Sequence, residues 1–568
     1  MSKKQKIVAV SVLAALGFAV YANTLWNGMF WDDYDFILHN RYVQNFEFGK
    51  FFTENVIAGA GFGSNYWRPV LLTVFSIEYQ VFGNWAAGYH LVNFLFHVAD
   101  ALLLLFIIYS LFKNYWLALL TSVIFVVHPL QTEAVSYANS LGDSLSVFFM
   151  LLGMWFYLKD RRILAILMYP LALMSKETAI VMPGLVGLIE MTGYLTPSLS
   201  DIGEGVRERL GGLFKKLWPY FAIAGIYIAL RATSLNFINT FNLYNEANPF
   251  TDSILVRIYT FFHSLVIYFG LMFWPRHLYI ERTMDFATAI SASVLAGGLI
   301  FIALLVLVFF FRKRMSAVSF GILWFFIALA PMSNVAVPIN GLLYEHWMYL
   351  PLVGIFFALL AFLYRITKVL KIEKIGFGLF IVIALAFAGR AVARNFEWHD
   401  AIGFYTQTLR YSPGSYRVNN NLGMAYADAK NYAIAEKYYQ LAISIDPKNP
   451  VAHYNLGNNY RDGGKNFLAI KAYEKAMEVD PDFPFVYSAL VNVYSMEKEY
   501  AKARALLATH LEKYPDQIET FISLGQVAIA QGDYAGAMAY LEKALAADPG
   551  NTAAQSLYIQ AKAKLPPS

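Results

Sequence analysis

Two adjoining stretches near the start of the chain decide the fold. The first is Ile7-Val-Ala-Val-Ser-Val-Leu-Ala-Ala-Leu-Gly-Phe-Ala-Val-Tyr-Ala-Asn-Thr24, and the second is Gly28-Met-Phe-Trp-Asp-Asp-Tyr-Asp35. A helix of about 20 apolar residues spans a bilayer, and aromatic residues such as Trp26 settle at the bilayer surface. We therefore predict a first membrane helix over residues 7–24, with Asp32 and Asp33 at its water-facing end.

A carboxylate pair at that level is placed to act on the headgroup of a lipid-borne substrate. The carboxylates stay hydrated enough to ionise there, while partial burial would raise the pKa of one of them towards that of a general base. The alternative interpretation of Asp32 and Asp33 is an ordinary solvated acidic loop. Motifs further along the chain favour the catalytic interpretation.

The composition is that of a polytopic membrane protein. Of the 568 residues, 58% are hydrophobic and 15% are charged, and the mean hydropathy is +0.46, well outside the range of soluble domains. The net charge of +5 does not indicate nucleic-acid binding, because Lys and Arg lie in short clusters between apolar runs. Without cysteine, the chain has no disulfide, thiolate metal site or cysteine nucleophile. No small-residue cleavage site precedes the Asp pair, which indicates a retained first helix.

Twelve apolar runs have roughly the length of a membrane span. They cover residues 7–24, 88–112, 115–128, 141–158, 163–175, 178–193, 217–231, 255–274, 287–311, 316–332, 349–364 and 375–391. Basic clusters mark cytoplasmic loops, and they lie before the first run and at 113, 159–162, 207–216, 312–314 and 365–374. The Asp32 loop and everything after about Phe396 are then extracytoplasmic. Because the N-terminus is then cytoplasmic, twelve complete crossings would return the C-terminus to the cytoplasm, which contradicts this orientation. We therefore expect about eleven crossings, with a re-entrant or interfacial segment between about Arg231 and Pro275.

The last third of the chain is built from repeats. Prolines recur every 34 residues, at Pro413, Pro447, Pro481, Pro515 and Pro549. Small residues and tyrosines recur in the same register, at Ala401, Ala435, Ala469, Ala503 and Ala537, at Gly423, Gly457 and Gly525, and at Tyr426, Tyr460 and Tyr494. This period, with small residues where two helices cross and Pro closing each unit, is the tetratricopeptide repeat (TPR) signature.

These patterns predict an all-α protein with two domains. We expect a membrane domain over residues 1–395, with an extracytoplasmic loop at 25–87, and an α-solenoid over residues 396–568. The solenoid would hold about four TPR repeats, preceded by a half repeat (Trp398 to Arg410) and followed by a capping helix.

Side-chain amides recur within the repeats, and an i, i+3 spacing places them on one helix face. They are Asn421, Asn455, Asn458, Asn492 and Gln526. An amide offers both a donor and an acceptor to an extended peptide backbone without demanding particular side chains. We therefore predict that this row binds an acceptor polypeptide; the alternative is a merely hydrophilic surface.

Several motifs, taken in order along the chain, resemble the transmembrane-and-TPR family of O-mannosyltransferase-like proteins, in the GT-C glycosyltransferase superfamily. They are Trp31-Asp32-Asp33, Tyr66-Trp67-Arg68-Pro69-Val70, the helix with His90, Asn93 and His97, His128-Pro-Leu-Gln-Thr-Glu-Ala-Val135, Asp143, Lys176-Glu177, Pro331-Met-Ser-Asn334 and Tyr344-Glu-His-Trp-Met-Tyr-Leu-Pro351. Two departures stand out: Leu141-Gly142 replaces an Arg before Asp143, and His346 stands where the family usually has Arg.

The resemblance implies a GT-C fold and a transferase that moves a sugar, most often mannose, from a polyprenyl-phosphate carrier to Ser or Thr of an extracytoplasmic protein. Asp32 or Asp33 would be the base. The candidates for holding the donor phosphate and sugar are Arg68, His128, Glu133, Lys176, Glu345 and His346, with Arg68 favoured because its fork grips two oxygens. A divalent cation, Mg²⁺ or Mn²⁺, on the Asp pair is an option that the transfer does not require.

Other interpretations of these residues remain open. His90, Asn93, His97 and Asp100 share a helix face and would then be interhelical hydrogen-bonding groups. Lys176-Glu177 would be an ion pair at a helix end. At the level of the whole protein, the rivals are a catalytically inactive membrane-anchored TPR adaptor and an enzyme acting on a glycolipid or cell-wall polymer. We expect a bacterial inner membrane, with the N-terminus cytoplasmic and the array periplasmic.

Overall fold

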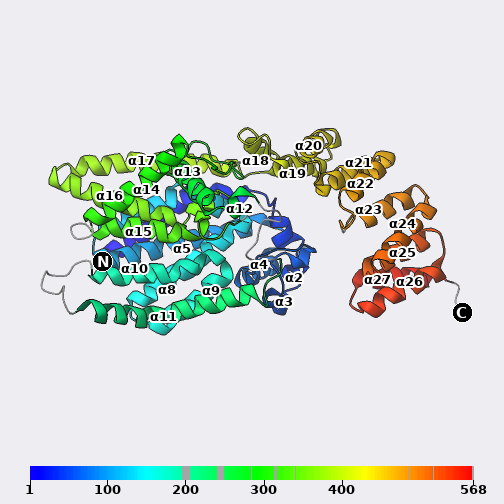
Figure 1. Cartoon of the computed structure of the whole chain (residues 1–568), viewed down its shortest axis with the longest axis horizontal. Coiled ribbons are helices and arrows are strands. Elements are labelled where there is room, and N and C mark those ends of the chain that lie inside the picture. Colours follow the sequence, from blue (N-terminus) through cyan, green and yellow to red (C-terminus); the bar gives the residue numbers. More distant parts are fainter. Residues whose placement is uncertain are drawn as a thin grey trace. The chain divides into compact units, whose positions relative to one another are not determined.

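The computed structural model describes residues 1–194, 205–238, 248–282, 284–311, 316–339, 341–483, 485–515 and 517–565. Helices make up the regular structure of these residues, and no strand occurs among them. They form two compact units, Met1–Gln407 and Thr408–Ser568; Figure 1 shows the helices of each. The predicted all-α class, a membrane-type bundle followed by a TPR solenoid, is confirmed.

The first unit contains eighteen α-helices among the described residues, counting one that runs into the second unit. They are α1 (Lys3–Tyr21), α2 (Arg41–Gln44), α3 (Phe48–Thr53), α4 (Pro69–Phe82), α5 (Ala86–Phe112), α6 (Tyr115–Val127), α7 (Thr132–Ser136), α8 (Leu141–Leu158), α9 (Arg162–Ser175), α10 (Met182–Tyr194), α11 (Gly205–Ala232), α12 (Pro249–Asp252), α13 (Ile254–Phe273), α14 (Ala292–Phe311), α15 (Ser316–Leu329), α16 (Pro351–Val369), α17 (Glu373–Phe396) and α18 (Ala401–Leu409).

Local sequence explains several of the helix ends. Helix α1 begins at a capping box, in which the Ser2 hydroxyl accepts from Gln5 N–H and the Gln5 side chain accepts from Ser2 N–H. Helix α5 ends at Lys113, whose φ of 53° is left-handed. Asn114 then caps α6 by accepting from Leu117 N–H. A short loop therefore reverses the chain between two antiparallel helices.

Eight described helices are long and apolar enough to cross a membrane, or nine if the bent pair Tyr115–Val127 and Pro129–Ser136 counts as one span. By length, this is fewer than the eleven crossings expected from the sequence. The difference lies in short helices such as α9, whose 14 residues rise only about 21 Å against a hydrocarbon core of about 30 Å. The basic side chains at Arg207, Arg209 and 312–314 lie outside the described residues.

Helix α13 bears on the parity of the crossings. Near its start, Arg257 donates to the Ala336 carbonyl at 3.1 Å, just after α15. Near its end, the Met272 carbonyl lies 2.8 Å from His128 Nε2, just after α6. The ends of α6 and α15 both lie beside the start of α16. Helix α13 is one of the eight helices long and apolar enough to cross a membrane, so the incomplete crossing expected between Arg231 and Pro275 stays a prediction; residues 239–247 lie outside the described part.

The second unit is a series of helix pairs. They are α19 (Tyr416–Asp428) with α20 (Tyr432–Ile445), α21 (Pro450–Asp462) with α22 (Asn466–Val479), α23 (Val486–Met496) with α24 (Tyr500–Lys513), and α25 (Ile518–Ala530) with α26 (Tyr534–Ala547), followed by α27 (Thr552–Lys564). The repeated glycines allow three of the four pairs to close tightly, because a Cβ on Gly457 would lie 2.5 Å from the Tyr473 ring. The repeats predicted from the 34-residue period are present.

Candidate active site

The acidic loop after α1 is held by main-chain hydrogen bonds. Asp33 is buried, and its two carboxylate oxygens accept N–H groups from Phe30 at 3.0 Å and from Asn139 at 2.8 Å. Burial raises the pKa of Asp33 well above its usual range, although these two hydrogen bonds oppose the shift. Asp33 therefore joins its own loop to the segment that precedes α8.

Asp32 is the more open member of the pair. It is half-buried, and its N–H donates to the Tyr137 hydroxyl at 2.9 Å. The preceding residue, Trp31, has a φ of 60°, in the left-handed region where a bulky side chain costs about 1–3 kcal/mol. Such strain persists only where the surroundings hold it, and it is concentrated at functional sites. The loop is thus held in one conformation, with Asp33 as its anchor and Asp32 nearer to solvent.

Arg68 lies just before α4, and its guanidinium fork is already occupied. Its Nε donates to Glu177 Oε2 at 3.0 Å and its Nη2 donates to Oε1 at 2.6 Å. The guanidinium also covers the Tyr66 ring at 4.4 Å. Burial opposes ionisation of both partners, yet the pair raises the pKa of Arg68 and lowers that of Glu177 to about 2. The fork that was predicted to grip a donor phosphate grips a carboxylate in this structure.

Lys176 forms a second ion pair, 2.7 Å from Asp143 in the first turn of α8. The expected pairing of Lys176 with its neighbour Glu177 is wrong. Lys176 has extended backbone angles, and successive side chains of an extended chain point in opposite directions. The two pairs are close enough for Asp143 to act on the charge of Arg68. Because Asn139 lies just before α8 and Asp143 in its first turn, this cluster and the Asp33 anchor both meet the start of that helix.

His128 is committed to main-chain groups. Its Nδ1 accepts from the Leu130 N–H at 3.1 Å, so its Nε2 carries the proton and donates to the Met272 carbonyl at 2.8 Å. The ring is fully buried and packs on Phe387 at 4.5 Å between centroids. This geometry fits a structural role, in which His128 joins the end of α6 to the end of α13.

The remaining predicted donor-site residues form a separate charged cluster. Glu133 accepts from both the main-chain N–H of His346, at 3.0 Å, and its Nδ1, at 2.7 Å. Glu345 accepts from the Tyr279 N–H at 2.6 Å and lies 3.6 Å from Arg394 Nη2. Burial raises the pKa of Glu345, and Arg394 opposes this effect. These contacts join α7, the loop before α16 and the end of α17.

The polar face of α5 joins helices. Tyr349 donates to Asp100 at 2.9 Å and lies 2.9 Å from His97 Nδ1. Asn93 donates to the Tyr137 carbonyl at 2.8 Å. These bonds support the interhelical interpretation of this face, and Asn93 adds a further hold on the segment that binds Asp32.

The amide row of the repeats is uneven. Asn455 donates to Asn420 at 3.0 Å, and Asn458 accepts from the Tyr473 hydroxyl at 2.7 Å. Asn492 and Gln526 are exposed, and Asn421 is half-buried. Part of the row therefore joins helices, while the exposed members remain available for a peptide.

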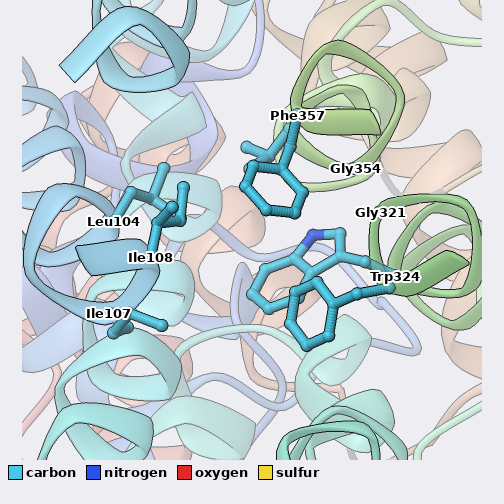
Figure 2. Close-up of a pocket in the computed structure, with 9 residues that line it drawn as sticks. Leu104, Ile107, Ile108, Gly321, Trp324, Gly354 and Phe357 are labelled. Carbon is cyan, nitrogen blue, oxygen red and sulfur yellow. The ribbon is translucent and has the colours of Figure 1, made fainter. Parts of the chain in front are cut away.

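An apolar crevice lies between α5, α15 and α16, and Figure 2 shows Ile108, Trp324 and Phe357 facing it. It is lined by apolar side chains and has room for about one water molecule, so it presents no acid, base or charged group that could act on a substrate. Within the described ranges, no three His, Asp or Glu side chains come together as a metal site would require.

Known proteins resemble both parts of the chain. Tetratricopeptide repeat models match residues 416–449, 450–483 and 528–565. Protein O-mannosyl-transferase F38B6.6 of Caenorhabditis elegans is 23% identical over 460 residues, covering 78% of this chain and 64% of that protein. Protein O-mannosyl-transferase TMTC4 of Mus musculus is 27% identical over 438 residues, covering 66% of this chain and 57% of that protein. The chain is similar to proteins of the transmembrane-and-TPR family.

This relationship confirms the resemblance seen in the motifs. The chain spans between about half and two thirds of the length of these relatives, with 51% coverage of protein O-mannosyl-transferase TMTC3 of Mus musculus. Among solved structures, YrrB, described as a TPR protein with an unusual peptide-binding site, is 19% identical with a TM-score of 0.24, covering 27% of this chain and 80% of that one.

Several residues of the site lie outside the motifs that were identified in the sequence. Tyr137 holds Asp32, and Arg282 and Arg394 face Glu345. Arg394 lies near the end of α17, which is long and apolar enough to cross a membrane, and a charge in such a helix is a candidate functional residue. The apolar run predicted from the sequence ended at residue 391 and left Arg394 outside the span. Tyr137 carried no signal, because a tyrosine beside an apolar run is ordinary.

Proposed function

We propose that this protein transfers mannose from a polyprenyl-phosphate carrier to a Ser or Thr hydroxyl of a polypeptide on the non-cytoplasmic side of a membrane. The observation that carries the proposal is the strained loop that fixes Asp33 and leaves Asp32 half-buried. The names of the relatives, protein O-mannosyl-transferases, support the reaction type.

In the proposed reaction, Asp32 accepts the proton of the acceptor hydroxyl as its oxygen attacks the anomeric carbon. The bond from that carbon to the phosphate oxygen breaks, and the lipid phosphate leaves with the bonding electrons. Asp33 serves as the anchor, because both of its oxygens already accept main-chain N–H groups. This divides the roles of the two carboxylates.

The departing phosphate needs positive charge, which the Arg68 and Lys176 pairs can supply at the start of α8. Glu177 is the more exposed partner of Arg68, with 38% of its side chain accessible against 10%. We propose that donor binding displaces Glu177 and passes the fork of Arg68 to the phosphate. The cost of breaking the ion pair is then offset by a new charge-assisted pair.

The distribution of basic residues supports a reaction on one face of the membrane. Asp32 and Asp33 follow α1, and Lys176 and Glu177 follow α9, whereas basic residues lie at the starts of these two helices, at Lys3, Lys4 and Lys6 for α1 and at Arg161 and Arg162 for α9. The TPR array follows α17, and we propose that it holds the acceptor polypeptide outside the cytoplasm. The relatives come from animals and lend no support to a bacterial inner membrane.

The test uses the full chain in lipid nanodiscs, with polyprenyl-phosphate mannose as donor and a Ser/Thr-rich peptide as acceptor. Mass spectrometry of the peptide should show the gain of one hexose per modified hydroxyl. A matched incubation with glycolipid as acceptor separates the protein substrate from the lipid substrate. Transfer to neither acceptor contradicts the proposal.

A membrane-anchored TPR adaptor is the second candidate. It is favoured by the ion pairing of both Arg68 and Lys176 in the structure and by His346 in place of the family's Arg. An adaptor would bind its polypeptide partners equally well with Asp32→Asn and Asp33→Asn, and would show no transfer with either donor or acceptor.

A further inference from the structure

Aromatic rings from two distant parts of the first unit meet around the acidic loop. One set precedes Asp32 or binds it, and the other follows α17. We call the two sets together the aromatic clamp; it consists of Phe30, Trp31, Tyr137, Trp398, Phe404 and Tyr405.

The clamp connects the start of the half repeat to the loop. Phe404 and Tyr405 lie on α18, before the end of the first unit at Gln407. The Phe404 ring lies 5.1 Å from that of Phe30, and the Tyr405 ring lies 5.4 Å from that of Trp31. Both contacts have the separation of paired aromatic rings, so α18 packs directly on the residues that lead into Asp32.

Main-chain bonds reinforce the same junction. The Gly28 N–H donates to the His399 carbonyl at 3.0 Å, and the Asn27 side chain donates to the Asn395 carbonyl at 3.3 Å. His399 lies in the segment that connects α17 to α18, and Asn395 lies in the last turn of α17. The loop is thus attached to this segment at its backbone as well as through its rings.

Tyr137 connects the clamp to Asp32 itself. Its ring stacks on Trp398 with a centroid distance of 5.4 Å and an interplanar angle of 27°. Its hydroxyl accepts the Asp32 N–H at 2.9 Å. Because Trp398 fixes the ring, it also fixes the hydroxyl that orients the backbone of Asp32.

The left-handed backbone of Trp31 requires such a hold. Its φ of 60° is disfavoured for a side chain of this size, and it persists only where neighbouring groups over-determine it. The neighbours here are Phe404 and Tyr405, whose rings flank Trp31 at 6.3 Å and 5.4 Å. Loosening the clamp would let Trp31 relax and turn Asp32 away.

We infer that the half repeat belongs to the transferase unit, with Tyr137 and Trp398 as positioning residues that hold Asp32 in its reacting orientation. This rests on the proposed function, in which Asp32 is the base. The acceptor-holding part of the array then begins after Gln407, and the first repeat helix contributes to the catalytic site instead of to the peptide groove.

The test uses full-length variants in nanodiscs. Tyr137→Phe keeps the stacked ring and removes only the hydroxyl that Asp32 uses. Tyr169→Phe is the matched control, since Tyr169 on α9 is also buried and its hydroxyl donates to the Ile180 carbonyl, outside the clamp. Trp398→Leu is the second variant, because it removes the ring against which Tyr137 stacks.

Two readouts are measured. The first is amide hydrogen exchange of the peptide covering residues 28–36, which Tyr137→Phe and Trp398→Leu should accelerate at least about threefold, because one neutral hydrogen bond is worth that much or more. The second is transfer kinetics, in which Tyr137→Phe should lower kcat about tenfold with both KM values within twofold. Tyr169→Phe should change neither readout.

A double-mutant cycle separates positioning from general support of the fold. If Tyr137 acts through Asp32, adding Tyr137→Phe to Asp32→Asn should lower kcat no further. An additive loss, or unchanged exchange of residues 28–36 in Tyr137→Phe, overturns the inference. If the wild type transfers no mannose while the exchange responds as expected, the clamp stands and the proposed function fails.

Discussion

The two units differ in the surroundings of their polar side chains: those of the candidate site in the bundle form buried ion pairs, whereas two amides of the array are exposed. In the bundle, Arg68 pairs with Glu177 and Lys176 with Asp143, and three of these four side chains are about 10% exposed. In the array, Asn492 and Gln526 are exposed and uncharged. A buried ion pair makes each partner costly to remove, whereas a neutral exposed amide costs little. We therefore expect single substitutions to matter in the bundle and only combined ones in the array.

The largest effect is expected at Asp32. Replacing it with Asn keeps its volume and hydrogen bonding but removes its basicity, so hexose transfer should fall at least about 100-fold. Expression and the melting temperature should change little, because Asp32 is half-buried. Asp33→Asn is the informative comparison, since one amide N–H₂ would then face a main-chain N–H of Phe30 or Asn139.

The two Asp variants should therefore differ. Asp33→Asn should lower both activity and the melting temperature, whereas Asp32→Asn should lower activity alone. Near-normal transfer by Asp32→Asn would remove it as the base, and equal thermal losses in both variants would contradict the division into base and anchor.

The next effect is expected for the Arg68–Glu177 pair. Glu177→Gln leaves Arg68 buried beside a neutral partner, which should cost about 1–3 kcal/mol at neutral pH, less than for a fully buried pair because Glu177 is partly exposed. The surface pair Lys475–Glu478, with side chains 49% and 69% exposed, is the matched control. Glu478→Gln should cost less than about 1 kcal/mol.

The pH dependence of this loss follows from the lowered pKa of Glu177. Its folded-state pKa of about 2 lies below the unfolded value of about 4.3. The stabilisation is complete above the unfolded value and is lost as the pH falls towards 2. Melting temperatures of wild type and Glu177→Gln should therefore approach one another progressively as the pH falls from about 4 towards about 2. Melts that stay equally separated at acidic pH would show that the ion pair is not the cause.

The array was predictable because its signal is local. Prolines such as Pro447 and Pro481 recur at a fixed period, and glycines such as Gly457 meet a large side chain of their own repeat. Local spacing is sufficient to define helix pairs of this kind. The bundle helices of ten residues or more were also visible as apolar runs, apart from α4, which lay within a stretch interpreted as a loop.

The partners of the site residues were not predictable. Arg68 meets Glu177 across 109 residues and Glu133 meets His346 across 213. Residue type suggested that each could hold a phosphate, but only the fold decides which charge is already neutralised. The same holds for His128, whose ring nitrogens are both used by main-chain groups.

A smaller effect is expected from a combined change in the array. Replacing Asn455, Asn458 and Asn492 with Ala together should weaken polypeptide binding by more than about tenfold, since each neutral hydrogen bond contributes about 0.5–1.5 kcal/mol. Glycosylation of a full-length acceptor should fall, while transfer to a short peptide that need not reach the array continues. The matched control replaces three exposed residues, Gln440, Lys471 and Lys475.

The triple variant also tests whether the amides hold the array together. Asn455 and Asn458 bond Asn420 and Tyr473 within the repeats, so the melting temperature is measured alongside binding. Equal loss of transfer to both substrates means that the array supports the fold, and equal retention places the peptide groove elsewhere.

The smallest effect is expected for Asn492→Ala alone. Asn492 is exposed on α23, so its substitution leaves no buried group unsatisfied and should change neither stability nor short-peptide transfer. Binding of a full-length acceptor should weaken by about threefold or less, the worth of one weak neutral hydrogen bond. Gln440→Ala, at an exposed position on α20, should change nothing. A tenfold loss of acceptor binding in Asn492→Ala alone would show that one amide provides most of the binding in the groove. It would contradict the expectation that single substitutions matter in the bundle and only combined ones in the array.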